Sequence, residues 1–344
     1  MYTCPRVKKM IFQLWGLFIY LSVLGCSSSP PEEEDFVLRR KKPPEVKQLH
    51  NIWEGDFRYV MSFHSCDVST TDCSDPWMHR TFLAASNDGS SWGILKQFSP
   101  ILTSVPDVIV RDGSLYVFGL PVQQKYAFPS GEKKDWARVE VLDDNNERFM
   151  NVDPSVIKDK DGKFVLFFLV GAVGGDPAAC PPDERQCKKT FRSATEIADS
   201  NGAQFRLDPG IRAQVQITAG NHFASDPDIF AGPEGFYMLI SRGQGVQVMF
   251  SSSLRGTYEP VSTLPNGMLT LTGGGVPAGH WDPKSKKFWI YVTKHRHNKT
   301  EIHRVVVPDF SRQPTRQEFR SVIRGSHFFT DDYLMASPGF YSLH

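Results

Sequence analysis

The sequence feature that most constrains the fold is a repeat that recurs about every 50 residues. Each copy contains a Pro, an apolar segment, a tight turn and an aromatic-rich segment. Asp-Gly or a similar pair supplies the turn, which is typical of a β-hairpin. The Pro residues that open the repeats are separated by 48, 73 and 50 residues, and they are Pro106, Pro154, Pro227 and Pro277. Periods of this length predict one four-stranded blade of a β-propeller per repeat.

Counting the copies predicts five blades. Four of them begin near Val105, Asp153, Asp226 and Gly279. The first blade spans about 51–98, where only its outer turn at 86–92 is recognisable, and the segment 328–341 can supply the strand that closes the ring. We therefore expect an all-β chain with a five-bladed β-propeller domain over residues 49–344. A β-sandwich is the alternative, since alternating strands alone fit both folds.

The composition sets limits on the partners of the protein. The formal net charge is +1, so we expect no nucleic-acid partner. The chain contains 25 Phe, 24 Pro and 27 Gly residues, which favours short strands with frequent turns. We expect a monomer without a cofactor, and the pattern of residues leaves open whether a metal is bound.

The N-terminus has the pattern of an export signal. Basic residues precede an apolar stretch at 10–24, which is short for a membrane span. The stretch ends in Val23-Leu24-Gly25-Cys26, which resembles the lipobox of bacterial lipoproteins, in which the Cys is diacylated. We therefore expect a signal peptide over 1–25, a lipid on Cys26 and a polar tether over 26–48. An uncleaved anchor and an ordinary signal peptide are the alternatives.

This resemblance implies an exported protein that is anchored by its lipid to the bacterial cell envelope. Ser27 follows the Cys where an Asp would direct retention, so the sorting rule points to the outer membrane. An oxidising compartment would also allow disulfides, and the remaining cysteines form two pairs of equal separation. The expected bonds are Cys66–Cys73 and Cys180–Cys187. Metal binding is the alternative, although neither pair has the spacing of a zinc knuckle.

The motifs, taken in order, resemble the five-bladed propeller glycosidases of glycoside hydrolase family 43 and the related invertases and levansucrases. The resemblance covers most of residues 50–320, and its motifs lie at 86–92, 105–108, 152–163, 236–241 and 279–280. It implies a glycosidase with three carboxylates at the narrow end of a central funnel. One acts as general base, one as general acid, and one tunes the pKa of the acid.

The family pattern maps only partly onto this chain. Asp153 matches the residue that tunes the acid. The position of the acid holds Ser225, with Asp226 beside it, and the base is expected at Glu54 or Asp56. We therefore expect a lipid-anchored hydrolase of the inverting type that acts on an oligosaccharide or polysaccharide. The alternative is a non-catalytic propeller that binds glycan or protein, because a propeller can keep its fold after losing its chemistry.

Other polar and aromatic residues have two interpretations each. Asp153 and Asp226 can instead be structural Asp-Pro turns, and we expect Asp107 and Asp228, which follow the Pro, to be structural. The candidates for binding substrate are His280, His222, Arg242 and Trp77. The alternatives are an interior position for the histidines, a salt bridge for the arginine and packing for the tryptophan.

Overall fold

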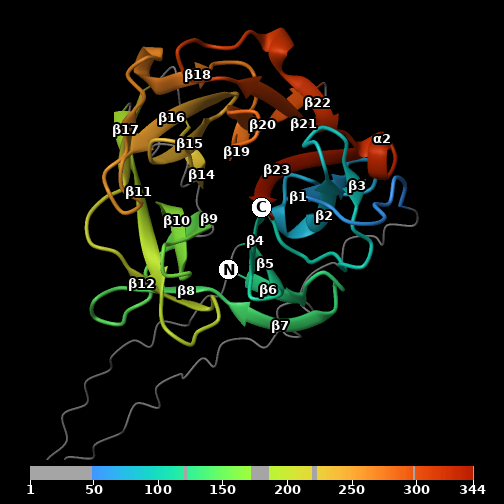
Figure 1. The fold of residues 1–344 in the computed structure, drawn as a ribbon, viewed down its shortest axis with the longest axis horizontal. Helices are drawn as coiled ribbons and strands as arrows, with labels where there is room; N and C mark the ends of the chain where they lie inside the picture. The colour runs from blue at the N-terminus through green and yellow to red at the C-terminus, as the bar shows by residue number, and fades with distance from the viewer. Residues whose placement is uncertain (1–48, 120–121, 172–185, 219–222, 297–298, 344) are drawn as a thin grey trace, which may run out of the picture. The chain divides into compact units, whose positions relative to one another are not determined.

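The computed structural model describes residues 49–119, 122–171, 186–218, 223–296 and 299–343, and it contains five β-sheets arranged as a five-bladed propeller (Figure 1). The innermost strands of the five sheets are β23, β4, β9, β14 and β19, and they lie around the centre of the ring. The fold class predicted from the repeat is therefore confirmed, and the sandwich alternative is excluded.

The strands of each blade are given from the centre of the ring outwards, and the innermost strand of blade 1 comes from the C-terminal end of the chain. Blade 1 contains β23 (Tyr333–Ser342), β1 (Tyr59–Asp67), β2 (Arg80–Ser86) and β3 (Gly93–Ile94). Blade 2 contains β4 (Asp107–Arg111), β5 (Ser114–Gly119), β6 (Val122–Ala127) and β7 (Lys133–Arg138). Blade 3 contains β9 (Asn151–Lys158), β10 (Phe164–Val170), β11 (Gln186–Glu196), β12 (Gln204–Leu207) and β8 (Glu140–Leu142), with β13 (Ala213–Thr218) also paired to β11.

Blade 4 contains β14 (Ser225–Ala231), β15 (Phe236–Arg242), β16 (Gly245–Ser251) and β17 (Glu259–Pro260), with β18 (Met268–Thr270) also paired to β16. Blade 5 contains β19 (Gly275–Asp282), β20 (Lys287–Arg296), β21 (Lys299–Val307) and β22 (Arg320–Ile323). The helical segments are short, and they are η1 (Pro76–Met78), η2 (Pro265–Gly267), η3 (Arg316–Glu318) and α2 (Gly325–Phe328). The inner strand of blade 5 thus begins at Gly275, before the Gly279 expected from the looser repeat.

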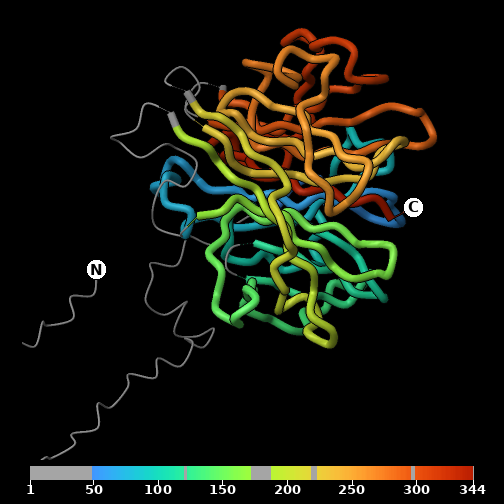
Figure 2. The backbone as a smooth tube through the Cα atoms, turned by 90° about the vertical axis from the view of Figure 1, so that its left-hand side faces the viewer, coloured from blue at the N-terminus to red at the C-terminus, as the bar shows by residue number. Residues whose placement is uncertain are grey.

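The two ends of the propeller domain meet in blade 1. Strand β23 pairs antiparallel with β1, for example Tyr59 with Ser342, and the Ser65 hydroxyl donates to the Leu334 carbonyl at 2.9 Å. In Figure 2 the red C-terminal strand lies beside the blue strands of the first blade. The segment at 328–341 therefore closes the ring as expected, and closure removes the sheet edges that an open array would expose.

Five clusters of buried apolar side chains fill the spaces between adjacent blades. Strand β10 shows why, because successive side chains on a strand point to opposite faces. Its residues Val165, Phe167 and Leu169 pack against blade 4, whereas Phe164, Leu166 and Phe168 pack against blade 2. A strand that is buried on both faces reads as a continuous apolar run, which is the pattern seen in the sequence.

Local turn chemistry also agrees with the sequence. Asp112 and Gly113 connect β4 to β5 with φ of +49° and +67°, the left-handed conformations that a two-residue hairpin requires. No helix in the described ranges is long and apolar enough to cross a membrane. The expected signal peptide, Cys26 and the tether lie outside these ranges.

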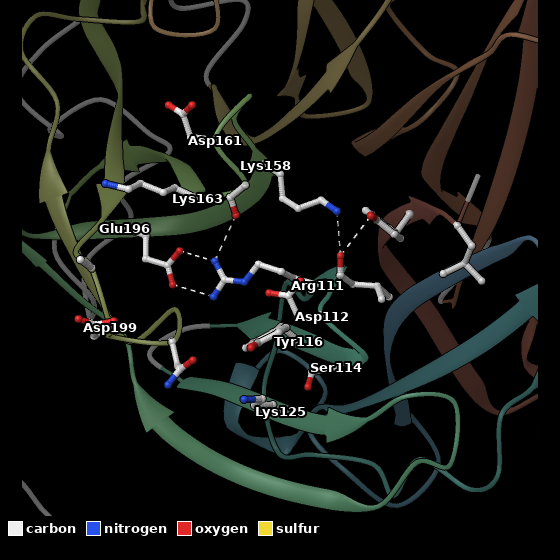
Figure 3. A pocket seen from close by; sticks show the side chains of 16 residues that line it. Arg111, Asp112, Ser114, Tyr116, Lys125, Lys158, Asp161, Lys163, Glu196 and Asp199 are labelled. Atoms are coloured by element: carbon white, nitrogen blue, oxygen red, sulfur yellow. Dashed lines mark hydrogen bonds and ion pairs between the residues drawn. The ribbon is translucent and has the colours of Figure 1, made fainter.

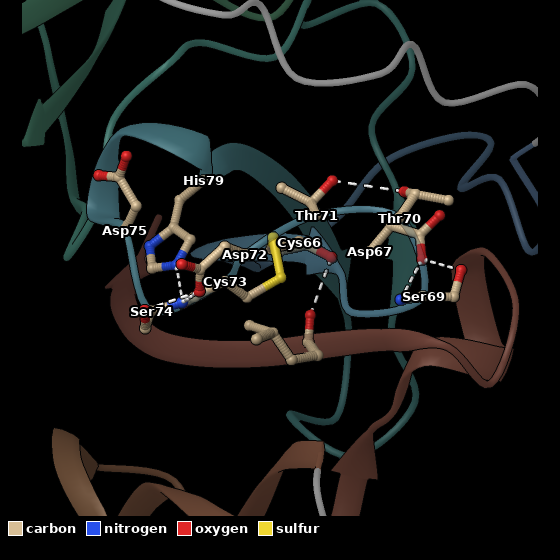
Figure 4. The surroundings of a disulfide bond; sticks show 12 residues. Cys66, Asp67, Ser69, Thr70, Thr71, Asp72, Cys73, Ser74, Asp75 and His79 are labelled. Atoms are coloured by element: carbon tan, nitrogen blue, oxygen red, sulfur yellow. Dashed lines mark hydrogen bonds between the residues drawn. A yellow bond between two sulfur atoms is a disulfide. The ribbon is translucent and has the colours of Figure 1, made fainter.

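The expected Cys66–Cys73 disulfide is present, with an S–S distance of 2.01 Å and a Cα–Cα distance of 5.9 Å. Figure 4 shows it at the end of β1, closing the loop that contains Asp67 and Asp72. Cys187 is also engaged in a disulfide bond. Its expected partner Cys180 lies outside the described residues, so that pairing stays a prediction.

Candidate functional site

A strained backbone position recurs in every blade, on the inner strand or, in blade 2, just before it. The residue before the Pro has a positive φ of +44° to +54° in all five cases: Ser337, Val105, Asp153, Asp226 and Val276. We call these five residues the bulge ring. Register shifts next to four of them identify β-bulges, which bend a strand. Positive φ is rare for any residue other than Gly, above all for Val, and such strain concentrates at functional sites.

Four backbone amides of the bulge ring, those of Val105, Asp226, Val276 and Ser337, are held from the preceding blade. Three of them donate to a side chain of its second strand, and the pairs are Val105 N to His64 Nδ1 at 3.3 Å, Val276 N to Ser241 Oγ at 3.0 Å and Ser337 N to Thr293 Oγ1 at 2.9 Å. In blade 3 the equivalent second-strand position holds Leu169, which has no side-chain acceptor. The Asp153 carboxylate replaces it and accepts the Asp226 amide at 3.4 Å.

Asp153 and Asp226 therefore lie together on adjacent blades, as expected from their equal positions before a Pro. The Asp226 carboxylate is half-buried and accepts the Ser225 hydroxyl at 2.5 Å. It forms no ion pair with any residue that the structure describes, and burial raises its pKa to about 6. A carboxyl with such a pKa is protonated in part near neutral pH, so it can donate a proton.

A second layer of side chains connects the inner strands of blades 2 to 5, and these side chains lie two residues after the bulge ring positions along the chain. Asp107 Oδ2 accepts the Val156 amide at 2.7 Å and the Ser155 hydroxyl at 3.1 Å. Ser155 Oγ accepts the Ile229 amide at 3.1 Å, and Asp228 Oδ2 accepts the Gly279 amide at 2.7 Å. We call Asp107, Ser155 and Asp228 the inter-blade ladder, since each bonds to the next blade. Asp107 and Asp228 are thus structural, as expected.

Both carboxyls of the ladder are fully enclosed. Burial raises the pKa of Asp107 to about 6. Burial also raises the pKa of Asp228 well above its usual range, and the nearby negative charge of Asp107 raises it further. Asp228 therefore holds its proton more tightly than an ordinary aspartate does, and the protonated form does not repel the charge of Asp107.

The two candidates for the general base do not join this site. Glu54 and Asp56 are exposed, and their segment runs beside β3, since Ile52 bridges Ile94 and the Trp53 amide donates to the Ile94 carbonyl. Strand β1 begins at Tyr59, just after this segment, and His64, which contacts the bulge ring, is five residues further on, so the segment lies near the opposite end of β1, about 17 Å away along the strand. The bulge ring position of blade 1 is held by Ser337 instead.

The candidate substrate-binding residues have different surroundings. His280 packs against Tyr59, Trp289 and Phe340 at centroid distances of 5.8, 5.5 and 4.8 Å. Burial lowers its pKa to about 4, and its buried Nε2 has no hydrogen-bond partner among the described residues. It is therefore an interior histidine, enclosed by aromatic rings. His222 lies outside the described residues.

Arg242 forms hydrogen bonds to neutral oxygens. Its guanidinium donates to the carbonyls of Phe223 and Gln216 at 2.9 and 3.2 Å and to Gln247 Oε1 at 2.8 Å. Trp77 lies half-buried in η1, on the loop between β1 and β2. Because β1 ends next to the bulge ring, this loop belongs to the same end of the propeller, where an aromatic ring can face a sugar.

Sequence reasoning missed a buried pair of histidines beside the bulge ring. His64 and His79 stack with ring centroids 4.1 Å apart, and the Ser104 hydroxyl lies 2.9 Å from His79 Nδ1. Burial lowers the pKa of both rings, most strongly that of His64. His64 Nδ1 accepts the Val105 amide, so its proton is on Nε2. The contact between His64 and Val105 depends on the position of His64 near the end of β1, which no local sequence pattern indicates.

No group of three or more His, Cys, Asp or Glu side chains within the described part of the chain can hold a metal ion. The geometry therefore defines a five-bladed β-propeller with two adjacent carboxylates at one end of its inner strands. Those carboxylates are Asp153 and Asp226.

No protein-family model matches the sequence, and no curated protein shows significant similarity to it. Similar solved structures include an endo-1,5-alpha-L-arabinanase from Thermotoga petrophila RKU-1, with 12% identity, a TM-score of 0.44 and coverage of 66% of this chain and 56% of that one. A family 43 glycoside hydrolase from a capybara gut metagenome has 13% identity, a TM-score of 0.45 and coverage of 87% and 67%. An endo-1,4-beta-xylanase from Bacteroides thetaiotaomicron VPI-5482 has 13% identity, a TM-score of 0.45 and coverage of 76% and 96%.

These neighbours include enzymes of the family that the sequence motifs resemble. The chain spans less than two thirds of the length of the arabinanase. At this level of similarity the assignment of the fold rests on the five sheets and their closure.

Proposed function

We propose that the protein is a glycoside-hydrolase-like propeller that acts on an oligosaccharide or polysaccharide at the bulge ring. The observation that carries the proposal is the placement of Asp226 beside Asp153, half-buried and with a pKa of about 6. A general acid for glycosidic cleavage needs a raised pKa, so that it holds a proton near neutral pH.

In this proposal Asp226 protonates the oxygen of the leaving sugar. Asp153 holds the Asp226 backbone through its amide, burial raises the pKa of Asp226, and a negative charge on Asp153 would favour the protonated acid further. Water attacks the anomeric carbon and releases a proton to the solvent, the proton that Asp226 loses ends on the leaving hydroxyl, and Asp226 then regains a proton from the solvent. The other three bulge ring positions are Ser337, Val105 and Val276, so they supply no carboxylate to activate the water.

The experiment is an assay of the purified full chain on aryl glycosides, including arabinofuranosides and xylopyranosides, and on polysaccharides. We expect turnover that falls as the pH rises through about 6, because Asp226 then loses its proton. Asp226→Asn should lower turnover by at least about 100-fold, the usual contribution of a general acid. The matched control is Asp331→Asn, which changes an exposed carboxylate. Equal activity in wild type and Asp226→Asn would contradict the role of Asp226.

A second candidate is a propeller that binds glycan or protein without catalysis. The observation that favours it is the hydrogen bond from the Asp226 amide to Asp153, which repeats the structural bonds accepted by Ser241 and Thr293 in other blades. This candidate predicts no turnover on any glycoside. It also predicts saturable binding of a glycan or a protein, and this binding should be unchanged in Asp226→Asn.

We also propose that the protein is exported and anchored to the cell envelope through a lipid on Cys26. The Cys66–Cys73 disulfide supports export, because disulfides persist mainly in oxidising compartments. The lipid would keep the propeller at the membrane surface, and the polar tether would let it reach a glycan there.

A further inference from the structure

A cavity without an assigned role lies between blades 2 and 3, with a volume of about 730 Å³. It is at the opposite end of the inner strands from Asp226. Lys158, the last residue of β9, lines it and is five residues from Asp153, so the two are about 17 Å apart along the strand. The volume falls within the range of small-ligand sites, about 300–1,000 Å³.

The floor of this cavity is rigid. Arg111 forms a two-point ion pair with Glu196, and its guanidinium lies 3.6 Å from the centroid of the Phe164 ring. Glu196 also accepts the amides of Phe164 and Gly202 at 3.0 and 2.7 Å. Figure 3 shows Arg111 and Glu196 facing each other in the centre of the cavity. Because these groups satisfy one another, a ligand would bind to the rim around them.

The rim carries equal numbers of cationic donors and anionic acceptors. The cationic groups are Lys125, Lys158 and Lys163, and the anionic groups are Asp112, Asp161 and Asp199. In Figure 3, Asp161, Lys158 and Lys163 of the β9–β10 hairpin lie across the cavity from Lys125 of β6. Among the residues that the structure describes, no ion pair joins any of these three lysines to any of these three aspartates, although Lys125 pairs with Asp135 at 3.9 Å.

This arrangement specifies the chemistry of the ligand. An ammonium group only donates hydrogen bonds and a carboxylate only accepts them, whereas a hydroxyl group does both. A ligand rich in hydroxyls can therefore satisfy both kinds of group at once, and the balanced charges give no preference to an ion. Tyr341 also lines the cavity, where Lys158 Nζ lies 5.5 Å from the centroid of its ring and donates to the Val110 carbonyl at 3.1 Å, so Lys158 has two further donor hydrogens for a ligand.

From this complementarity we infer a second carbohydrate-binding site between blades 2 and 3, at the end of the propeller opposite Asp226. The inference rests on the proposed function in taking a glycan as the natural ligand. A site at each end would let one protein bind a polysaccharide at a point removed from the cleaved bond, which raises the local concentration of substrate.

The test is isothermal titration of the full chain with xylotriose and with arabinotriose. The informative variant is Asp161→Ala/Lys163→Ala, which keeps the net charge. Neither side chain forms a hydrogen bond that the structure records, so the hairpin should fold. The matched control is Glu234→Ala/Lys284→Ala, which changes exposed residues on the corresponding hairpins of blades 4 and 5.

We expect Asp161→Ala/Lys163→Ala to weaken the binding of at least one trisaccharide by about tenfold, the loss of one or two hydrogen bonds to charged groups. The control and Asp226→Asn should leave this binding within about twofold of wild type. No saturable binding to the wild-type chain, or equal binding to the double variant, would overturn the inference. Loss of all binding in Asp226→Asn would also overturn it, because binding would then occur at the bulge ring.

Hydrolysis of aryl glycosides separates this inference from the proposed function. The double variant should hydrolyse a small aryl glycoside as wild type does, because Asp226 is untouched. A wild-type chain that hydrolyses nothing, yet binds a trisaccharide in a manner sensitive to Asp161 and Lys163, would remove the proposed reaction and keep the second site. Hydrolysis of an aryl glycoside without trisaccharide binding that depends on Asp161 and Lys163 would keep the proposed reaction and remove the second site.

Discussion

The Asp153 carboxylate accepts a hydrogen bond from the Asp226 backbone amide, 3.4 Å away on the next blade. This bond has two consequences. It supplies the acceptor for the Asp226 amide, since Leu169 cannot accept a hydrogen bond at the position of Ser241 and Thr293. It also brings the Asp153 charge next to the residue proposed to donate a proton. The Asp153 side chain thus has a structural role and a proposed role in setting the pKa of Asp226.

Two substitutions of Asp153 separate these roles. Asp153→Asn keeps an oxygen that accepts the Asp226 amide, so we expect a melting temperature close to that of wild type. The loss of negative charge should lower the pKa of Asp226, move the falling limb of the pH–rate profile to lower pH and reduce turnover at neutral pH at least about tenfold. Asp153→Ala should in addition lose about 1–3 kcal/mol of unfolding free energy, because the amide loses its acceptor. Unchanged activity in Asp153→Asn would leave only the structural role.

The raised pKa of Asp226 predicts how stability depends on pH. Its folded-state pKa of about 6 exceeds the ordinary value of 3.8, so the folded chain binds more protons between these pH values. Its contribution to the unfolding free energy must then fall as the pH rises from about 4 to about 6, and it stays low above that. The side chain of Asp226→Asn cannot ionise. The unfolding free energy of this variant minus that of wild type, measured in urea, should therefore increase by about 1–3 kcal/mol between about pH 4 and pH 6. A difference that is the same at pH 4 and pH 7 would refute the assignment.

The inter-blade ladder should be important for stability. Ser155 donates to Asp107 and accepts the Ile229 amide, and it is buried. Ser155→Ala leaves that amide without an acceptor, and we expect a loss of about 1–3 kcal/mol in the free energy of urea unfolding. Ser262→Ala, at an exposed position, is the control and should change the value by less than about 0.5 kcal/mol. If both variants unfold alike, the ladder does not stabilise the ring.

The second disulfide can be tested directly. We expect non-reducing peptide mapping of the exported protein to find Cys180 linked to Cys187, in addition to the Cys66–Cys73 bond. Each bond closes a loop of about eight residues, so each should contribute about 2–3 kcal/mol through the entropy of the unfolded chain. A free Cys180 thiol, or a link from Cys187 to another cysteine, would refute the pairing.

The lipid anchor predicts a change of location. Cys26→Ala removes the acylated residue, so the protein should either accumulate unprocessed or appear in the soluble fraction. Fractionation and intact mass measurement of the mature chain distinguish these forms from wild type, whose mass should include the lipid. A processed variant that stays in the membrane fraction would argue for an anchor elsewhere in the chain.

The local pattern of the sequence determined most of the blades. Aromatic and branched residues at 164–170 form a strand buried on both faces, and Asp112-Gly113 adopts the hairpin turn that its composition favours. The adjacency of Asp153 and Asp226 also followed from the sequence, because both precede a Pro on the inner strand of neighbouring blades.

Only the tertiary structure decided which residue of blade 1 faces the site. Glu54 and Asp56 open the first blade in the sequence, but the inner strand of that blade is β23, from the other end of the chain. Ser337 therefore takes the position where a carboxylate was expected. The positive φ of Val105 and Val276 is likewise not a local preference, since branched residues disfavour it. It arises from contacts made across blade boundaries, and such contacts join residues too far apart for a local pattern to encode.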